Sequence, residues 1–101
     1  MVAVRNYLKA LQASGLALQI GVIFGSQVTG TAGLWSDIDL LVVSAGFDRR
    51  ASRRLVDRLW HLAARVDNRI EPIPCGARHW REDRTSPLVQ AARREGVPVA
   101  A

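Results

Sequence analysis

Two short, strongly apolar segments constrain the fold of this chain more than any other feature. They cover residues 16–24 and 37–43, and both are dense in valine, isoleucine and leucine. Runs of this length and β-branched character predict buried strands, because helices of globular proteins are usually longer. Gly25 follows the first segment and Ser36 precedes the second, so each strand is bounded by a turn-forming residue. We therefore expect a sheet that other elements must cover.

Apolar residues at helical spacing predict the elements that supply this cover. The predicted helices are residues 2–13, 50–66 and 88–95, with a short helical turn followed by a loop at 27–33. The apolar stripe of the longest helix is Leu55, Leu59, Leu62 and Val66. We expect Trp60 and Trp80 to lie in the core or at a subunit contact, and we expect the protein to be an oligomer.

A third strand is predicted at residues 69–74, where Pro72 and Pro74 lack the N–H groups that a central strand needs. Residues two apart direct their N–H groups to the same side, so this strand can still pair along its other edge and should border the sheet. A final strand is predicted at 97–99. The order of elements favours a small α/β (α+β) fold, a mixed β-sheet with helices packed against it.

The length of 101 residues predicts one domain, 1–101. No apolar run approaches the ~18 residues that span a bilayer, and the N-terminus has no signal-peptide pattern, so we expect no membrane association. Cys75 is the single cysteine, which excludes an internal disulfide and suits a reducing cytoplasm. The sequence thus predicts a cytoplasmic protein.

The net charge of +5 comes almost wholly from arginine, because Lys9 is the only lysine. Two interpretations remain open. The arginines either line solvated helix faces, or they contact an anionic partner, which is a nucleic acid or an acidic protein surface.

Asp37 and Asp39 open the second predicted strand and are two residues apart, so their side chains project from the same face. Two like charges side by side repel, and burial increases the cost. A divalent cation such as Mg²⁺ reverses this effect, because it binds carboxylate oxygens together with substrate phosphates. The simpler alternative is a solvated pair of acids at the start of a strand.

Gly25 and Ser26 follow the first predicted strand and form the second half of the pattern. Gly25 permits close approach of a ligand to the backbone, and Ser26 is a suitable cap for a helical turn whose free N–H groups attract phosphate. An ordinary strand-to-helix turn is the alternative.

In combination, these residues resemble the minimal nucleotidyltransferase domains of the DNA polymerase β superfamily. The family pattern is Gly-Ser, three residues, Gly, five residues and Ser-Asp-x-Asp. It is met here by Gly25, Ser26, Gly30, Ser36, Asp37 and Asp39. The third metal carboxylate of the family lies on a later strand, where this chain has Glu71.

The resemblance implies a site for two Mg²⁺ ions held by Asp37, Asp39 and Glu71, with ATP or another NTP as substrate. Gly25 and Ser26 would hold its phosphates, together with the motif residues Gly30 and Ser36. One departure concerns Thr29, where many relatives have an arginine. By the family comparison, either the triphosphate binds more weakly here or another arginine replaces the lost cation, with Arg49 to Arg54 as candidates.

The resemblance also implies a partner. Minimal nucleotidyltransferases of prokaryotes are often encoded beside a helical HEPN-type toxin and act as antitoxins that nucleotidylate it. Transfer of AMP to a hydroxyl of such a toxin is the favoured hypothesis. Two alternatives remain: a non-catalytic binding antitoxin with the same fold, or a nucleotidyltransferase that acts on RNA or on a small molecule such as an aminoglycoside.

Overall fold

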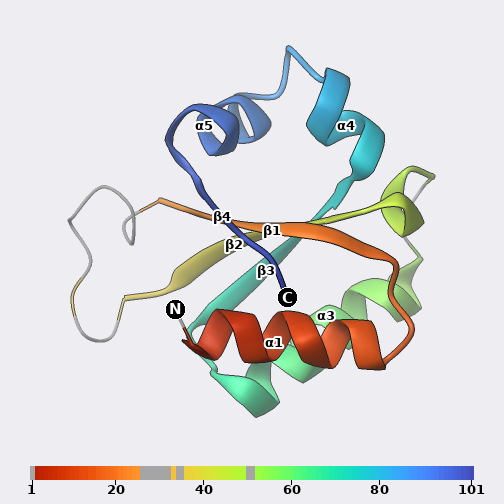
Figure 1. Ribbon diagram of the computed structural model, residues 1–101, viewed down its shortest axis with the longest axis vertical. Coiled ribbons are helices and arrows are strands. Elements are labelled where there is room, and N and C mark those ends of the chain that lie inside the picture. The colour runs from red at the N-terminus through yellow and green to blue at the C-terminus, as the bar shows by residue number, and fades with distance from the viewer. Residues whose placement is uncertain (1, 26–32, 34–35, 50–51) are drawn as a thin grey trace.

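A four-stranded mixed sheet forms the middle layer of the protein, with helices on both of its faces (Figure 1). The computed structural model describes residues 2–25, 33, 36–49 and 52–101. The strand order is β3-β2-β1-β4; β1 pairs antiparallel with β2 and with β4, and β2 pairs parallel with β3. The expected mixed sheet with packed helices is confirmed.

The elements follow the predicted order, with two additions. They are α1 (Val2–Ala13), β1 (Leu18–Phe24), β2 (Ile38–Ser44), the 3₁₀ helix η1 (Ala45–Phe47), α3 (Arg53–Val66), β3 (Ile70–Gly76), α4 (Ala77–Glu82), α5 (Pro87–Glu95) and β4 (Val97–Val99). The sequence interpretation missed η1 and α4, which are too short to show a helical period. The long helix begins at Arg53 rather than at residue 50, because the Ser52 hydroxyl accepts a hydrogen bond from the Leu55 N–H at 3.2 Å and caps it there.

The proline-containing strand β3 is at the border of the sheet, as predicted. It is longer than expected and continues to Gly76. A parallel neighbour of β2 requires a crossover connection, and α3 supplies it. Consequently β2 and β3 both start at one end of the sheet.

One core lies between the sheet and the layer formed by α1 and α3. Ile38, Leu40 and Val42 of β2 point into it and are fully buried, as their alternation predicted. The Tyr7 hydroxyl crosses this layer and donates to the Leu59 carbonyl at 2.9 Å, and burial raises the pKa of Tyr7 far above its usual value. This hydrogen bond ties α1 to α3.

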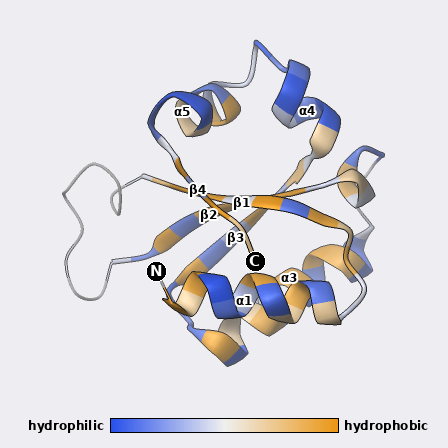
Figure 2. Cartoon of the chain, in the orientation of Figure 1, coloured by the Kyte–Doolittle hydropathy of each residue, from blue (hydrophilic) through white to orange (hydrophobic). Residues whose placement is uncertain are grey.

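A second core lies on the opposite face, under α4 and α5. Leu41 and Val43 point into it, so residues 40–43 of β2 are buried on both sides and form a continuous apolar run after Asp39. Hydrophobic residues mark the middle of the sheet, between the two layers of helices (Figure 2). Trp80 packs against this core, and the Arg93 guanidinium lies over its ring at 5.7 Å. Trp60 does not belong to either core, because it faces outward from α3 and is 48% exposed. Val66 also departs from the predicted buried stripe.

None of the described helices has the length and apolar character that crossing a membrane requires.

Candidate active site

Three carboxylates gather where β2 and β3 begin. Asp39 and Glu71 are direct partners in the parallel register of these strands, and Asp37 precedes Asp39 by two residues. Leu41 and Ile73 continue the same sides of the two strands and pack against the core under α4 and α5, so the carboxylates project from that face. The tertiary structure therefore brings together acids that are more than thirty residues apart in the sequence.

Glu71 shows the electrostatic consequence of this arrangement. Partial burial raises the pKa of Glu71 first, the negative charge of Asp37 raises it further, and hydrogen bonds to Asp39 and Asp37 add to the effect. A carboxyl can hydrogen-bond a carboxylate only when it carries the proton, so these contacts act in the same direction as the burial of Glu71 and raise its pKa.

The donor chemistry of the three acids suits Mg²⁺, which prefers hard carboxylate oxygens. A bound cation would take the place of a proton among these carboxyl groups, and it would turn the repulsion between their negative charges into attraction to the ion. As they stand, however, the described residues contain no group of three His, Cys, Asp or Glu side chains spaced to hold a metal ion. The metal site therefore stays a prediction that rests on the chemistry of the three acids and on the register of their strands.

Gly25 is a glycine for a reason that the sequence interpretation missed. Its φ of +77° lies in the left-handed region, and a Cβ at this position would lie 2.4 Å from Asp39 Oδ2. The chain therefore turns at Gly25 while its backbone is in contact with the Asp39 carboxylate. A glycine makes this close contact without moving the Asp39 side chain. The sequence argument attributed this space to a ligand, whereas the structure shows that a predicted metal ligand occupies it.

Ser36 closes a turn directly before the first of the three acids. Its hydroxyl accepts a hydrogen bond from the Gly33 N–H at 2.7 Å, and its own N–H donates to the Gly33 carbonyl at 3.2 Å. The other predicted phosphate-binding residues, Ser26 and Gly30, lie outside the described residues.

The helical turn expected from residue 27 also lies outside the described residues, as do Thr29 and Trp35. Those predictions are neither supported nor contradicted by the structure.

The structure does not support the arginines between residues 49 and 54 as the source of the missing cation. Arg49 and Arg53 follow the far end of β2, and a seven-residue strand is about 20 Å long. Arg69 is at the correct end, because its carbonyl accepts the Ile38 N–H at 2.7 Å where β2 begins. Its guanidinium donates to both carboxylate oxygens of Asp67, at 3.1 and 2.7 Å. The ion pair with Asp67 thus fixes the Arg69 guanidinium two residues from Glu71 in the sequence. The Asp-x-Arg spacing of residues 67 and 69 was the sequence signal for this pair, and we overlooked it.

The model of the nucleotidyltransferase domain family matches residues 4–85, a segment that contains all three carboxylates. The chain belongs to this family. The resemblance inferred from the Gly-Ser and Asp-x-Asp pattern is thereby confirmed, and the protein is a nucleotidyltransferase by family.

Two solved structures resemble this nucleotidyltransferase over most of its length. One is described as a crystal structure of a toxin-antitoxin with AMP-PNP; it is 25% identical, with a TM-score of 0.62, and the match covers 93% of this chain and 70% of that one. The other is described as a "putative nucleotidyltransferase" from Sulfolobus solfataricus. It is 18% identical with a TM-score of 0.63, covers 96% and 76% of the two chains, and supports the polymerase-β-like fold alone. The comparison with curated proteins gave no match.

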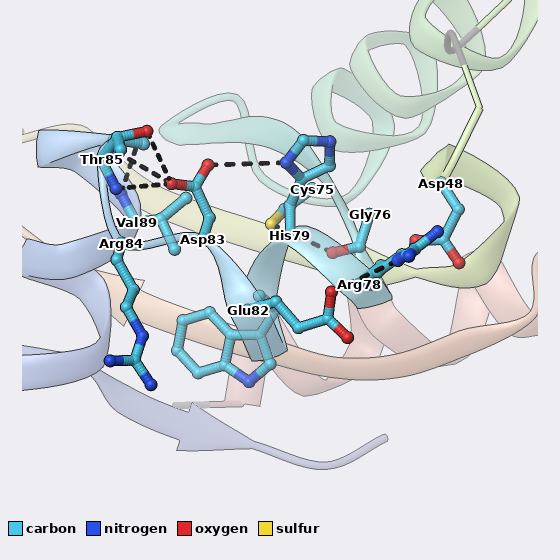
Figure 3. A network of polar contacts seen from close by, with 12 residues as sticks. Asp48, Cys75, Gly76, Arg78, His79, Glu82, Asp83, Arg84, Thr85 and Val89 are labelled. Atoms are coloured by element: carbon cyan, nitrogen blue, oxygen red, sulfur yellow. Dashed lines mark hydrogen bonds and ion pairs between the residues drawn. The ribbon is translucent and has the colours of Figure 1, made fainter.

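The nucleotidyltransferase also has a concave region at the opposite end of its sheet, lined by Asp48, Arg78, His79, Glu82, Asp83 and Thr85 (Figure 3). Its volume of about 410 Å³ could hold a small molecule. Its polar groups are nevertheless engaged with one another: Asp48 accepts the Arg78 N–H at 2.9 Å, and the N–H groups of Ser86 and Thr85 hold the pKa of Asp83 at about 2. These contacts join η1, α4 and α5, so we assign this region a structural role.

Proposed function

We propose that this nucleotidyltransferase transfers AMP from ATP to a hydroxyl of a partner protein, and that it acts in this way as the antitoxin of a HEPN-type toxin. The observation that carries the proposal is the juxtaposition of Asp37, Asp39 and Glu71 at the start of two parallel strands. Asp37 and Asp39 raise the pKa of Glu71, because three negative charges in one place repel one another. A bound cation would offset this repulsion when all three acids are ionised. Phosphoryl transfer needs cations in the same place.

Asp37, Asp39 and Glu71 would hold two Mg²⁺ ions in this proposal. The bound ions would supply electrostatic stabilisation of the charge that develops on the transferred phosphoryl group. The acceptor hydroxyl oxygen forms a bond to the α-phosphorus, the bond between that phosphorus and the bridging oxygen breaks, and pyrophosphate leaves. Glu71 would take the hydroxyl proton as a carboxylate, a role that the family resemblance gives it.

The nucleotide and the partner are supported by different observations. A structure with 25% identity and a similar fold is described as a toxin-antitoxin with AMP-PNP, an analogue of ATP. The HEPN class of the toxin rests on the family resemblance alone. By the same resemblance, Gly25, Ser26, Gly30 and Ser36 would hold the triphosphate.

Transfer of label from α-³²P-ATP to the product of the neighbouring gene tests the proposal. We expect a labelled partner that depends on added Mg²⁺ and resists pyrophosphatase. The double variant Asp37→Asn and Asp39→Asn should lose at least 10³-fold in rate, because it removes two of the three predicted metal ligands. Glu71→Gln should lose a similar factor, whereas its matched control Glu95→Gln, an exposed acid on α5, should keep full activity.

The alternatives give different results in the same assay. A binding antitoxin would neutralise the toxin equally well after Asp37→Asn and Asp39→Asn, without any labelled product. Labelled RNA or a labelled aminoglycoside in the absence of a protein acceptor would indicate another substrate class.

A further inference from the structure

The net charge of the protein is concentrated on one layer. Helices α1 and α3 carry six basic residues and one acid, while the rest of the chain contains eight of each. The six are Arg5, Lys9, Arg53, Arg54, Arg58 and Arg65, and the acid is Asp57. The whole charge of +5 thus belongs to the two helices α1 and α3, because the charges of the remaining residues cancel.

These cations point away from the core. Arg5, Lys9, Arg54 and Arg65 are exposed, while Arg58 is half-buried and donates to the Ser14 carbonyl at 3.3 Å. The two helices lie side by side below the sheet (Figure 1), so their outward sides form one continuous surface. We call the outward surface made by these five residues the basic face. On α3, three of them follow helical spacing, and His61 lies in the same row.

Two exposed apolar side chains also belong to α3, on either side of the arginine row. Trp60 is 48% exposed on α3, and Val66 is 37% exposed at its C-terminal end. Tryptophan and arginine are the residues most enriched at the energetic centres of protein interfaces. A phosphate backbone makes no favourable contact with an aliphatic side chain such as Val66, so this composition favours a protein partner over a nucleic acid.

The C-terminal end of α3 lies at the same end of the sheet as the candidate active site, although the three carboxylates project from the opposite face of the sheet. Helix α3 ends at Val66, and β3 begins at Ile70, one residue before Glu71. A protein that covers the C-terminal half of α3 is therefore beside the end of the sheet where the three carboxylates lie. Its surface would need acidic residues to match Arg65 and the neighbouring arginines.

We propose that the basic face, together with Trp60 and Val66, docks an acidic surface of the protein that accepts the nucleotide. This inference rests on the proposed function, because it assumes a protein acceptor. Arginine suits the role, since its planar guanidinium pairs with carboxylates through two parallel hydrogen bonds. Docking on this layer leaves the opposite face of the sheet, with α4 and α5, uncovered.

Charge reversal on the two sides of the sheet tests the proposal. The probe is the purified product of the neighbouring gene, with affinity measured by calorimetry at 0.05 M and 0.5 M NaCl. The variant is Arg54→Glu with Arg65→Glu. The matched control is Arg81→Glu with Arg94→Glu, which changes the net charge equally at exposed sites on α4 and α5.

We expect the α3 variant to bind at least tenfold more weakly at low salt, with a smaller difference at high salt, while the control stays within twofold. Trp60→Ala should also weaken binding, at both salt concentrations. Urea unfolding of each variant verifies that it is folded.

Equal binding by the α3 variant, or an equal loss in both variants, overturns the docking site. A loss of binding to a 20-base-pair DNA duplex, with partner binding unchanged, also overturns it in favour of a nucleic-acid surface. The proposed function is separable from this result, because Asp37→Asn with Asp39→Asn should abolish label transfer without affecting docking. If the wild-type protein transfers no label to any protein, the proposed function fails; if it transfers label but ignores the charge reversal, only the docking site fails.

Discussion

The contact between Gly25 and the Asp39 carboxylate yields the sharpest prediction. Replacement of Gly25 by alanine places a methyl group 2.4 Å from Asp39 Oδ2, in a backbone conformation with φ of +77°. Side-chain-bearing residues in the left-handed region cost about 1–2 kcal/mol. The overlap is with the terminal oxygen of a partly exposed side chain, so it is relieved when the Asp39 carboxylate rotates off its rotamer, which costs about 0.5–1.5 kcal/mol more. We expect Gly25→Ala to lower the free energy of unfolding by ~1.5–3.5 kcal/mol.

Gly15 offers a matched control within the same chain. It also has a positive φ, of +101°, but a Cβ there would meet nothing within 4 Å. Gly15→Ala therefore includes the backbone strain and the loss of unfolded-state entropy, without the steric overlap. The difference in unfolding free energy between the two variants, measured by urea denaturation, isolates the contact with Asp39.

A second substitution decides whether Asp39 is the cause. In the background of Asp39→Ala the carboxylate is absent, so Gly25→Ala should cost no more than Gly15→Ala does. Gly25→Ala should also lower the rate of nucleotidyl transfer about 10²-fold, because the displaced carboxylate is a predicted metal ligand. Equal costs for the two glycine variants in the wild-type background would refute the argument.

Further predictions concern charged and hydrogen-bonded groups. Because the folded state raises the pKa of Glu71 above 4.5, the folded protein keeps a proton that the unfolded chain loses, so this group makes stability fall as pH rises through its raised pKa; urea unfolding from pH 4 to 8 should show that slope lost in Glu71→Gln. Mg²⁺ binding should release a proton from the wild type, which calorimetry in buffers of different ionisation enthalpy can detect, and less from Glu71→Gln. Arg69→Gln should weaken AMP-PNP binding at least tenfold, whereas Arg65→Gln on α3 should bind normally; equal affinity in all three proteins would exclude Arg69 as the cation near the triphosphate. Arg93→Lys should cost ~2–3 kcal/mol, because the guanidinium donates to three carbonyls at and after α4 and a lysine cannot reach all of them; a loss below ~0.5 kcal/mol would contradict that role. Tyr7→Phe should cost about 1 kcal/mol by thermal or urea unfolding, since it removes one buried hydrogen bond.

Much of the fold follows from local patterns. The strand at residues 97–99, the helix that ends at Glu95 and the border position of β3 were all predicted, because each depends on a proline, a glycine or a short apolar run that acts locally. The two-sided burial of β2 was not predicted. Its apolar alternation indicated one core, and only the arrangement of α4 and α5 shows why Leu41 and Val43 are apolar as well.

The candidate site divides in the same manner. Spacing alone placed Asp37 and Asp39 on one face of a strand, since alternation is a property of any extended chain. The choice of Glu71 as their companion came from the family resemblance, and the parallel register of β2 and β3 now places it directly beside Asp39. Arg49 and Arg53, offered by the sequence as a source of the cation, follow the far end of β2. Distance along the sequence cannot distinguish the two ends of a strand, whereas the fold separates them by about 20 Å.

The sequence by itself determined the four strands and three of the helices of this nucleotidyltransferase, and which family its motif matches. Periodicity and turn chemistry act over a few residues, so they can be recognised without knowledge of the fold. The tertiary structure alone decided how distant segments meet: Gly25 against the Asp39 carboxylate, Arg69 at the start of β2, and the whole net charge on α1 and α3. These relations arise from the order and direction of the strands, which depend on how the two cores pack and not on any local pattern.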